Sequence, residues 1–217
     1  MKLVGVAALA AGLLVAGAAS AGANLVSDGQ FDTPAGAPPF QTVFAPNALG
    51  AWTVDSGSID FIDGYWQSPP GGGNSVDLDG DSAGSISQSL NTVAGQVYDL
   101  SFYLSGNPDS GPNVTKTGSV NVVTGPGSTF SFTAPPGQSK VTMDYVLENL
   151  SFTATSSSTD LTFTGVNPGA YGAVIGDVSV TAAPEPATWG LMLLGIGMVG
   201  GVLRYGRRAR DSAIVAV

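Results

Sequence analysis

Alternating apolar and polar residues in the middle of the chain predict short β-strands. Leu100, Phe102 and Leu104 occupy every second position, and Ser101 and Tyr103 lie between them. A period of two with one apolar face is typical of a half-buried strand. Similar runs predict further strands at residues 58–62, 76–79, 85–90, 119–123, 129–133, 149–155, 160–164 and 173–180.

Turn-forming residues separate these runs. Gly, Pro, Asn and Asp cluster at residues 71–74, 79–80, 106–108, 125–127, 135–137 and 167–169. No segment between residues 24 and 181 keeps a 3.6-residue apolar period beyond two turns. This spacing predicts a single all-β domain, with a jelly-roll β-sandwich as the favoured version. Trp52, beside Val54 in such a run, is expected in its core.

The N-terminal segment has the pattern of a secretory signal peptide. Lys2 precedes an uncharged apolar stretch over residues 3–19, and small residues offer cleavage sites at 19–21 and 21–23. A retained N-terminal membrane helix is the alternative, and the cleavage sites argue against it. The sequence therefore predicts export, with removal of residues 1–23.

A second apolar segment covers residues 187–203. As a helix it would be roughly 25 Å long, just enough to cross a bilayer core of about 30 Å. The basic residues that follow it are Arg204, Arg207, Arg208 and Arg210. The positive-inside rule keeps them in the cytoplasm and places the preceding domain outside. A buried core helix is the alternative, which the flanking prolines and arginines disfavour.

This segment resembles a known sorting signal. Pro184, Glu185 and Pro186, the glycine-spaced apolar run and the arginines follow the order of the PEP-CTERM signal of Gram-negative bacteria. The resemblance implies processing by an exosortase, a membrane transpeptidase, usually in bacteria that make exopolysaccharide. Such signals mostly stop at the arginines, whereas residues 211–217 continue this chain. The predicted organisation is a signal peptide (1–23), a β-sandwich domain (24–182) and a sorting signal with a transmembrane helix (183–217).

The charge of the middle region limits its partners. Residues 22–183 carry fourteen acids and two bases, Lys116 and Lys140, which gives a net charge of −12. Nucleic acid is excluded as a partner, because binding to phosphates needs Lys and Arg. The chain has no cysteine, so it has no disulfide framework despite its predicted oxidising destination.

Short sequence motifs along the domain resemble those of the choice-of-anchor C family, which is related to the plant DUF642 proteins. They occur in order at residues 24–32, 52–54, 58–66, 75–80, 85–88, 95–98, 106–108, 152–154, 161–163 and 176–180. The resemblance implies a galactose-binding-like jelly roll and association with polysaccharide. No enzymatic activity is attached to the family.

The residue types present limit the chemistry. Histidine and cysteine are both absent, which excludes a Ser-His-Asp triad and a His-ligated zinc site. Paired carboxylates could still hydrolyse glycosides. The acids fall mostly in turns or at outward strand positions, such as Asp77 and Asp79, where solvated surface groups are expected instead.

Two acids are candidate calcium ligands. Asp77, Asp79 and Asp81 alternate, but Ser82 and Gln88 break the EF-hand pattern. Carbohydrate-binding jelly rolls, which resemble this predicted fold, often join their first and last strands through Ca²⁺. The matching acids are Asp32, at the end of the predicted first strand, and Asp177, in the last. Gly176 stands where such jelly rolls often have an Asp. The alternative is that Asp32 and Asp177 are ordinary acidic residues of turns.

Exposed aromatic residues are candidates for stacking on sugar rings. Tyr65 and Trp66 fall in a loop without alternation. Polar contacts are expected from Asp60, Asp63, Asn107 and Tyr171 in neighbouring loops. The alternative is that Tyr65 and Trp66 form a hydrophobic lid over the sandwich. The leading hypothesis is a non-catalytic exported protein of the cell surface or matrix that binds glycan, and the alternatives are a structural coat protein or a glycoside hydrolase.

Overall fold

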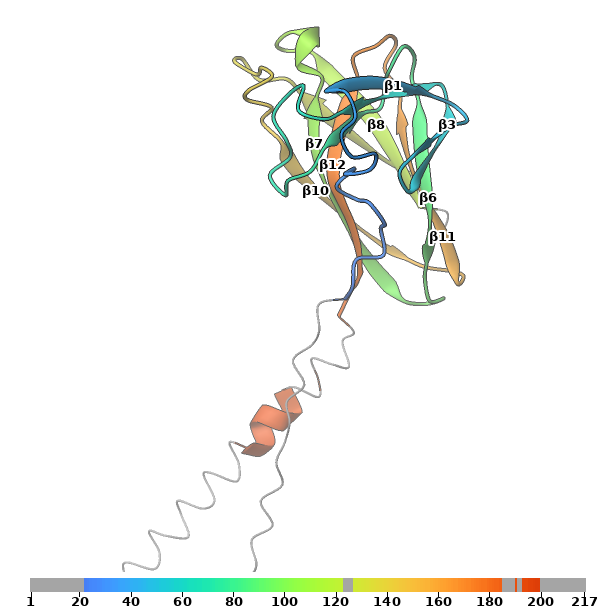
Figure 1. Cartoon of the computed structure of the whole chain (residues 1–217). Coiled ribbons are helices and arrows are strands. Elements are labelled where there is room, and N and C mark those ends of the chain that lie inside the picture. Colours follow the sequence, from blue (N-terminus) through green and yellow to red (C-terminus); the bar gives the residue numbers. More distant parts are fainter. Residues whose placement is uncertain (1–21, 123–126, 185–189, 191–192, 200–217) are drawn as a thin grey trace, which may run out of the picture. The chain divides into compact units, whose positions relative to one another are not determined.

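The computed structural model describes residues 22–122, 127–184, 190 and 193–199 (Figure 1). The compact β-rich unit covers Gly22–Ala183. The predicted signal peptide up to residue 21, most of the predicted membrane segment 187–203 and the arginine cluster lie outside the described residues. Within the described part, no helix combines the length and apolar character that a membrane span requires.

The domain is a sandwich of two six-stranded antiparallel sheets. The first sheet has the order β1 (Phe40–Phe44), β4 (Ser58–Ile62), β5 (Ser75–Asp77), β12 (Ala173–Ala182), β7 (Val97–Gly106) and β10 (Val146–Thr153). The second has the order β2 (Ala48–Leu49), β3 (Trp52–Ser56), β6 (Ser85–Asn91), β11 (Ser158–Gly165), β8 (Thr115–Val122) and β9 (Ser128–Thr133). The all-β jelly-roll prediction is confirmed.

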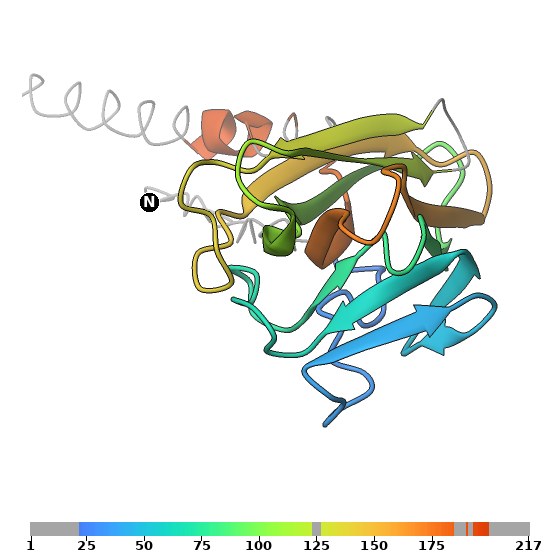
Figure 2. The same cartoon turned by 90° about the horizontal axis from the view of Figure 1, so that it is seen from above.

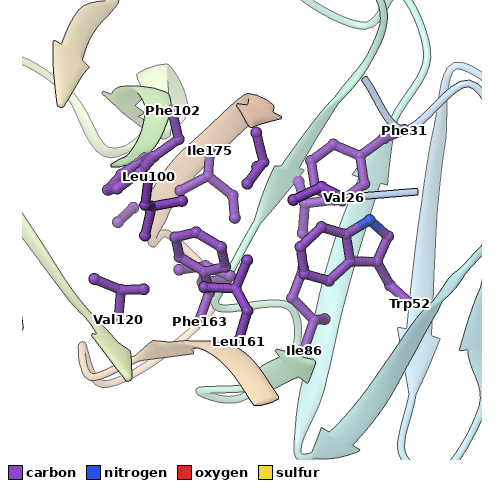
Figure 3. Packing of buried hydrophobic residues seen from close by; sticks show 14 of the residues in the cluster. Val26, Phe31, Trp52, Ile86, Leu100, Phe102, Val120, Leu161, Phe163 and Ile175 are labelled. Carbon is purple, nitrogen blue, oxygen red and sulfur yellow. The ribbon is translucent and has the colours of Figure 1, made fainter. Parts of the chain in front are cut away.

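Alternation within the strands fills the space between the sheets with apolar side chains (Figure 3). The ring centroids of Phe102 and Phe163, from opposite sheets, lie 5.1 Å apart, and those of Trp52 and Phe163 lie 6.2 Å apart. Such aromatic pairs add to the stabilisation from buried area. Trp52 is buried as predicted, and its Nε1 donates a hydrogen bond to the carbonyl of Asp28 (3.0 Å).

A second, smaller apolar cluster covers the outer face of the first sheet. Ile62, Trp66, Met143 and Val174 form it, and Tyr145 packs against them. Trp66 comes from the β4–β5 loop, and Met143 comes from the β9–β10 loop. These loops shield part of a sheet face that the alternation of β4 and β5 would otherwise expose to water.

The structure differs from the sequence predictions in three places. β1 and the two-residue β2 were not predicted. The segment before Asp32 contains turns in place of the predicted first strand. It still lies beside β12. The N–H of Leu25 donates to the carbonyl of Val180, and the N–H of Val178 donates to the carbonyl of Gly29, both at 2.8 Å.

The domain's own termini and a group of polar loops lie at opposite ends of the sandwich. β12 runs from Ala173 to Ala182, and ten residues of strand span about 33 Å. The chain enters beside the Ala182 end (Figure 1). The turn before Ala173 and the 3₁₀ helix η1 (Pro108–Ser110) lie at the other end, on which Figure 2 looks down.

Candidate functional site

An exposed aromatic group, the Tyr65 surface, consists of Phe40, Tyr65, Asp109 and Lys140. The rings of Phe40 and Tyr65 lie 5.6 Å apart at a tilt of 54°. Lys140 Nζ lies 3.9 Å from the Tyr65 ring centroid, donates to the Tyr65 hydroxyl (2.5 Å) and pairs with Asp109 (3.1 Å). The Tyr65 hydroxyl donates to Asp109 Oδ2 (3.2 Å). The contacts order Tyr65, which keeps 38% of its surface exposed beside Phe40 at 44%.

Sequence reasoning missed three members of the Tyr65 surface. Phe40 opens β1, where Phe40, Thr42 and Phe44 alternate with inward Val43. That alternation was the available signal for an outward aromatic residue. No local sequence pattern connects Asp109 and Lys140 to Tyr65. These three residues are far apart in the sequence, and only the tertiary fold brings them together.

Trp66 does not belong to this exposed group. It is 5% exposed, and its Nε1 donates to the Ser75 hydroxyl (2.9 Å). Because Trp66 packs between sheet and loop, its faces are not available to a sugar ring. The prediction of Trp66 as a glycan contact is therefore wrong, and for this residue the lid alternative holds.

Beside the Tyr65 surface, three aspartates form a buried group, Asp60, Asp77 and Asp79. They are 4%, 0% and 0% exposed, so the expectation that Asp77 and Asp79 are solvated is wrong. Asp77 Oδ2 accepts hydrogen bonds from Asn107 Nδ2 (2.7 Å) and from the N–H of Gly172 (3.2 Å). Its Oδ1 accepts one from the N–H of Asp79 (3.0 Å).

Burial controls the protonation of this group. Desolvation raises the pKa of Asp77 to about 8, although its hydrogen bonds oppose the shift. Desolvation also raises the pKa values of Asp60 and Asp79. Asp79 Oδ1 is buried and accepts no hydrogen bond within the described residues. These carboxyls lie beneath the surface, where a polysaccharide chain cannot approach them.

The remaining predicted glycan contacts divide between surface and interior. Asp60 and Asn107 are each 4% exposed, so they are not available for direct sugar contact, which corrects that prediction. Tyr171 is 48% exposed, and its ring centroid lies 5.9 Å from Lys116 Nζ. Tyr171 therefore remains a candidate, at the edge of the buried aspartates.

A separate polar hollow of about 320 Å³ contains both predicted calcium ligands. Its lining includes Asp28, Gln30, Asp32 and Asp177. Asp177 lies at an irregularity of β12 with φ of +48°, and Gln30 Nε2 donates to its Oδ1 (3.3 Å). The structure thus brings Asp32 and Asp177 to one place, although they are far apart in sequence.

The donors in this hollow are of a type that suits calcium. Asp28 Oδ2 is buried without a hydrogen-bond partner among the described residues, and desolvation raises the pKa of Asp28. Carboxylate and backbone oxygens are hard ligands of the kind that Ca²⁺ prefers. The described residues nevertheless form no group of three acidic side chains placed to hold a metal. Calcium binding by Asp32 and Asp177 stays a prediction.

Comparison with known proteins gives two family matches. The family described as "Protein of unknown function (DUF642)" matches residues 24–181, and the PEP-CTERM protein-sorting motif matches residues 182–208. Halomucin of Haloquadratum walsbyi (strain DSM 16790 / HBSQ001) is 30% identical over 177 residues. That match covers 75% of this chain but 2% of halomucin.

Solved structures give weaker matches. The CBM22-1 xylan-binding domain of Paenibacillus barcinonensis Xyn10C is 18% identical, with a TM-score of 0.42, and covers 77% of this chain and 99% of that one. The MgGH51 α-L-arabinofuranosidase is 16% identical, with a TM-score of 0.46, and the match covers 76% of this chain and 27% of that one. At these TM-scores the likenesses carry no argument about binding or catalysis.

Proposed function

Because this chain belongs to the DUF642 family and carries a PEP-CTERM protein-sorting motif, we propose that it is a non-catalytic surface protein that associates with exopolysaccharide. The motif indicates export. An exosortase is the proposed processing partner, and Pro184, Glu185 and Pro186 with the arginines after residue 203 are the proposed recognition elements. The membrane segment 187–203 would anchor the chain until it is processed.

The observation that carries the binding proposal is the Tyr65 surface. Tyr65 and Phe40 present two neighbouring aromatic rings to solvent. Apolar faces of sugar rings pack on such rings, and the Lys140–Asp109 pair offers a donor and acceptors to hydroxyl groups. Asp109 belongs to η1, at the end of the sandwich away from the domain's termini. The Tyr65 surface can therefore face the matrix while the chain leaves from the other end.

Charge favours a neutral polysaccharide as the partner. The domain carries a net charge of −12, which repels polyanions at low ionic strength. Lys140 could attract an acidic sugar, but its ion pair with Asp109 offsets that charge. We therefore assign the Tyr65 surface to uncharged sugar units.

Fractionation of the native host tests the sorting proposal. The mature form is expected in the exopolysaccharide fraction, shortened at both ends, and enzymatic digestion of the polysaccharide should release it. In a host without its exosortase, the chain should keep its C-terminal segment and remain in the membrane fraction. Finding the intact 217-residue chain folded in the cytosol would contradict the proposal. Retention in the envelope after complete polysaccharide digestion would favour the structural coat protein.

A further inference from the structure

The two lysines of the domain each lie over the ring of an exposed tyrosine. Lys140 Nζ lies 3.9 Å from the ring centroid of Tyr65, and Lys116 Nζ lies 5.9 Å from that of Tyr171. Residues 22–183 contain no other lysine and no arginine. A cation within about 6 Å of an aromatic centroid is attracted to the face of the ring. Both basic side chains of the domain therefore help to order a tyrosine.

Tyr171 keeps the outer face of its ring open to solvent. Lys116 is 7% exposed whereas Tyr171 is 48% exposed, so the lysine lies on the inner side of the ring. The lysine stem packs against Gly106, where an added Cβ would lie 3.0 Å from Lys116 Cγ. A ring that is already held in place loses less freedom when a ligand binds, which favours affinity. Tyr171 is thus a second ordered and accessible aromatic ring.

Hydrogen bonds join the segment of Tyr171 to the segment that contacts Tyr65. The carbonyl of Gly172, the residue after Tyr171, accepts a hydrogen bond from the N–H of Asn107 (3.0 Å). Asn107 Oδ1 caps η1 by accepting a hydrogen bond from the N–H of Asp109 (2.9 Å). The carboxylate of Asp109 accepts a hydrogen bond from the Tyr65 hydroxyl (3.2 Å). The two tyrosines are therefore attached to opposite sides of one short segment.

This segment is short and fixed from below. The Cα atoms of Asn107 and Asp109, two residues apart, lie at most about 7 Å from each other. The buried Asp77 Oδ2 accepts hydrogen bonds from both Asn107 Nδ2 and the N–H of Gly172. η1 lies between the two tyrosine loops at the end of the sandwich on which Figure 2 looks down. The two rings thus flank η1 at a spacing that a short run of linked sugars can bridge.

We propose that Tyr171 is a second sugar-binding subsite, so that the domain binds internal runs of several linked neutral sugars rather than chain ends. This inference rests on the proposed glycan binding at the Tyr65 surface. A sugar stacked on Tyr65 brings the next units of the same chain to Tyr171 at a high effective concentration. Between the rings, the exposed carboxylate of Asp109 accepts hydrogen bonds from sugar hydroxyl groups.

Binding of sugars of increasing length tests the proposal. The probe is a size-fractionated ladder prepared by partial hydrolysis of the host's neutral exopolysaccharide, and it is titrated into the mature exported protein. The affinity should rise at least about tenfold from the shortest members to those that reach both rings, and then level off. Equal affinity at every length would overturn the second subsite while leaving glycan binding at Tyr65 intact.

Chemical reduction of the ladder distinguishes internal units from chain ends. Borohydride opens the ring of the reducing-end sugar and leaves every internal unit unchanged. The longer members should therefore bind equally well before and after reduction. Loss of their binding after reduction would show that the protein recognises the reducing end, which contradicts the proposal.

Variants with wild-type thermal stability assign the gain in affinity to Tyr171. Tyr171→Ala should remove the gain with length and leave the binding of the shortest members unchanged, whereas Tyr171→Phe keeps the ring and should keep the gain. Tyr65→Ala should weaken binding at every length. Phe44→Ala, at an exposed position of β1, is the matched control and should behave like wild type. A full gain in Tyr171→Ala would overturn the inference, and no binding by wild type at any length would contradict the proposed function as well.

Discussion

Two groups of aspartates in this domain differ mainly in their access to water. Asp60, Asp77 and Asp79 lie beneath loops, and amide or hydroxyl donors hold them. Asp32 and Asp177 line an open hollow at the irregular part of β12. Burial favours neutral carboxyls in the first group, whereas solvent access lets the second group take a cation. The same side chain therefore has a structural role in one place and a candidate ligand role in the other.

The largest expected difference between the groups is in stability. Asp77→Ala leaves the buried donors Asn107 Nδ2 and Gly172 N–H without an acceptor, which should lower the free energy of unfolding by about 3 kcal/mol. Asp32→Ala removes an exposed side chain and should change the free energy of unfolding by about 0.5 kcal/mol or less in calcium-free buffer. Urea unfolding of both variants measures this difference. Equal losses would show that burial does not distinguish the two groups.

The sequence could predict the fold but not this difference in burial. Alternation in runs such as Leu100–Leu104 identified most strands, because one face of each packs into the sandwich core. The same alternation placed Asp77 on the outer face of β5, where solvent was expected. The outer face is covered by loops that bring together residues distant in sequence, such as Trp66 with Met143 and Val174. Local periodicity contains no information about that cover.

Some residues of the candidate sites could be predicted from the sequence and others could not, because local patterns do not show which residues the tertiary fold covers. Asp32 and Asp177 were predicted as partners through the resemblance of the predicted fold to carbohydrate-binding jelly rolls, and the structure places both in one hollow. Tyr65 was predicted as an exposed aromatic residue, which it is. Trp66 follows it directly and is buried, because adjacent residues of the loop point in different directions. Phe40 was missed because β1 was not predicted.

Acidification should stabilise the domain through the buried group. The folded pKa values of Asp60, Asp77 and Asp79 are raised above 3.8, to about 8 for Asp77. The stabilisation is therefore complete below the unfolded value and is lost as pH rises through the folded values. The free energy of unfolding should fall by about 3 to 4 kcal/mol between pH 5 and pH 8.

Urea unfolding across this pH range measures the effect. Asp77→Asn should flatten most of the dependence, and Asp60 and Asp79 should keep part of it. Asp32→Asn is the control and should leave the dependence nearly unchanged. Stability that rises steadily from pH 5 to pH 8 would contradict the assignment of neutral buried carboxyls.

A smaller effect is expected from calcium at the open hollow. Ca²⁺ held by Asp32 and Asp177 would join the segment before β1 to β12, so adding it should raise the Tm by about 3 °C. Asp177→Asn should abolish the shift without straining the backbone, because asparagine tolerates a φ of +48°. Asp81→Asn, an exposed acid outside the hollow, is the control. An equal shift in wild type and Asp177→Asn would place the cation elsewhere.

Binding of the exported protein to the host's neutral exopolysaccharide is the most direct test of the proposed function. Tyr65→Ala should weaken binding at least about tenfold, because loss of about 1.4 kcal/mol of aromatic contact corresponds to that factor. Phe44→Ala, which removes an exposed aromatic ring of β1 outside the Tyr65 surface, should bind like wild type. Unchanged affinity in Tyr65→Ala, measured on a variant with wild-type thermal stability, would contradict glycan recognition at the Tyr65 surface.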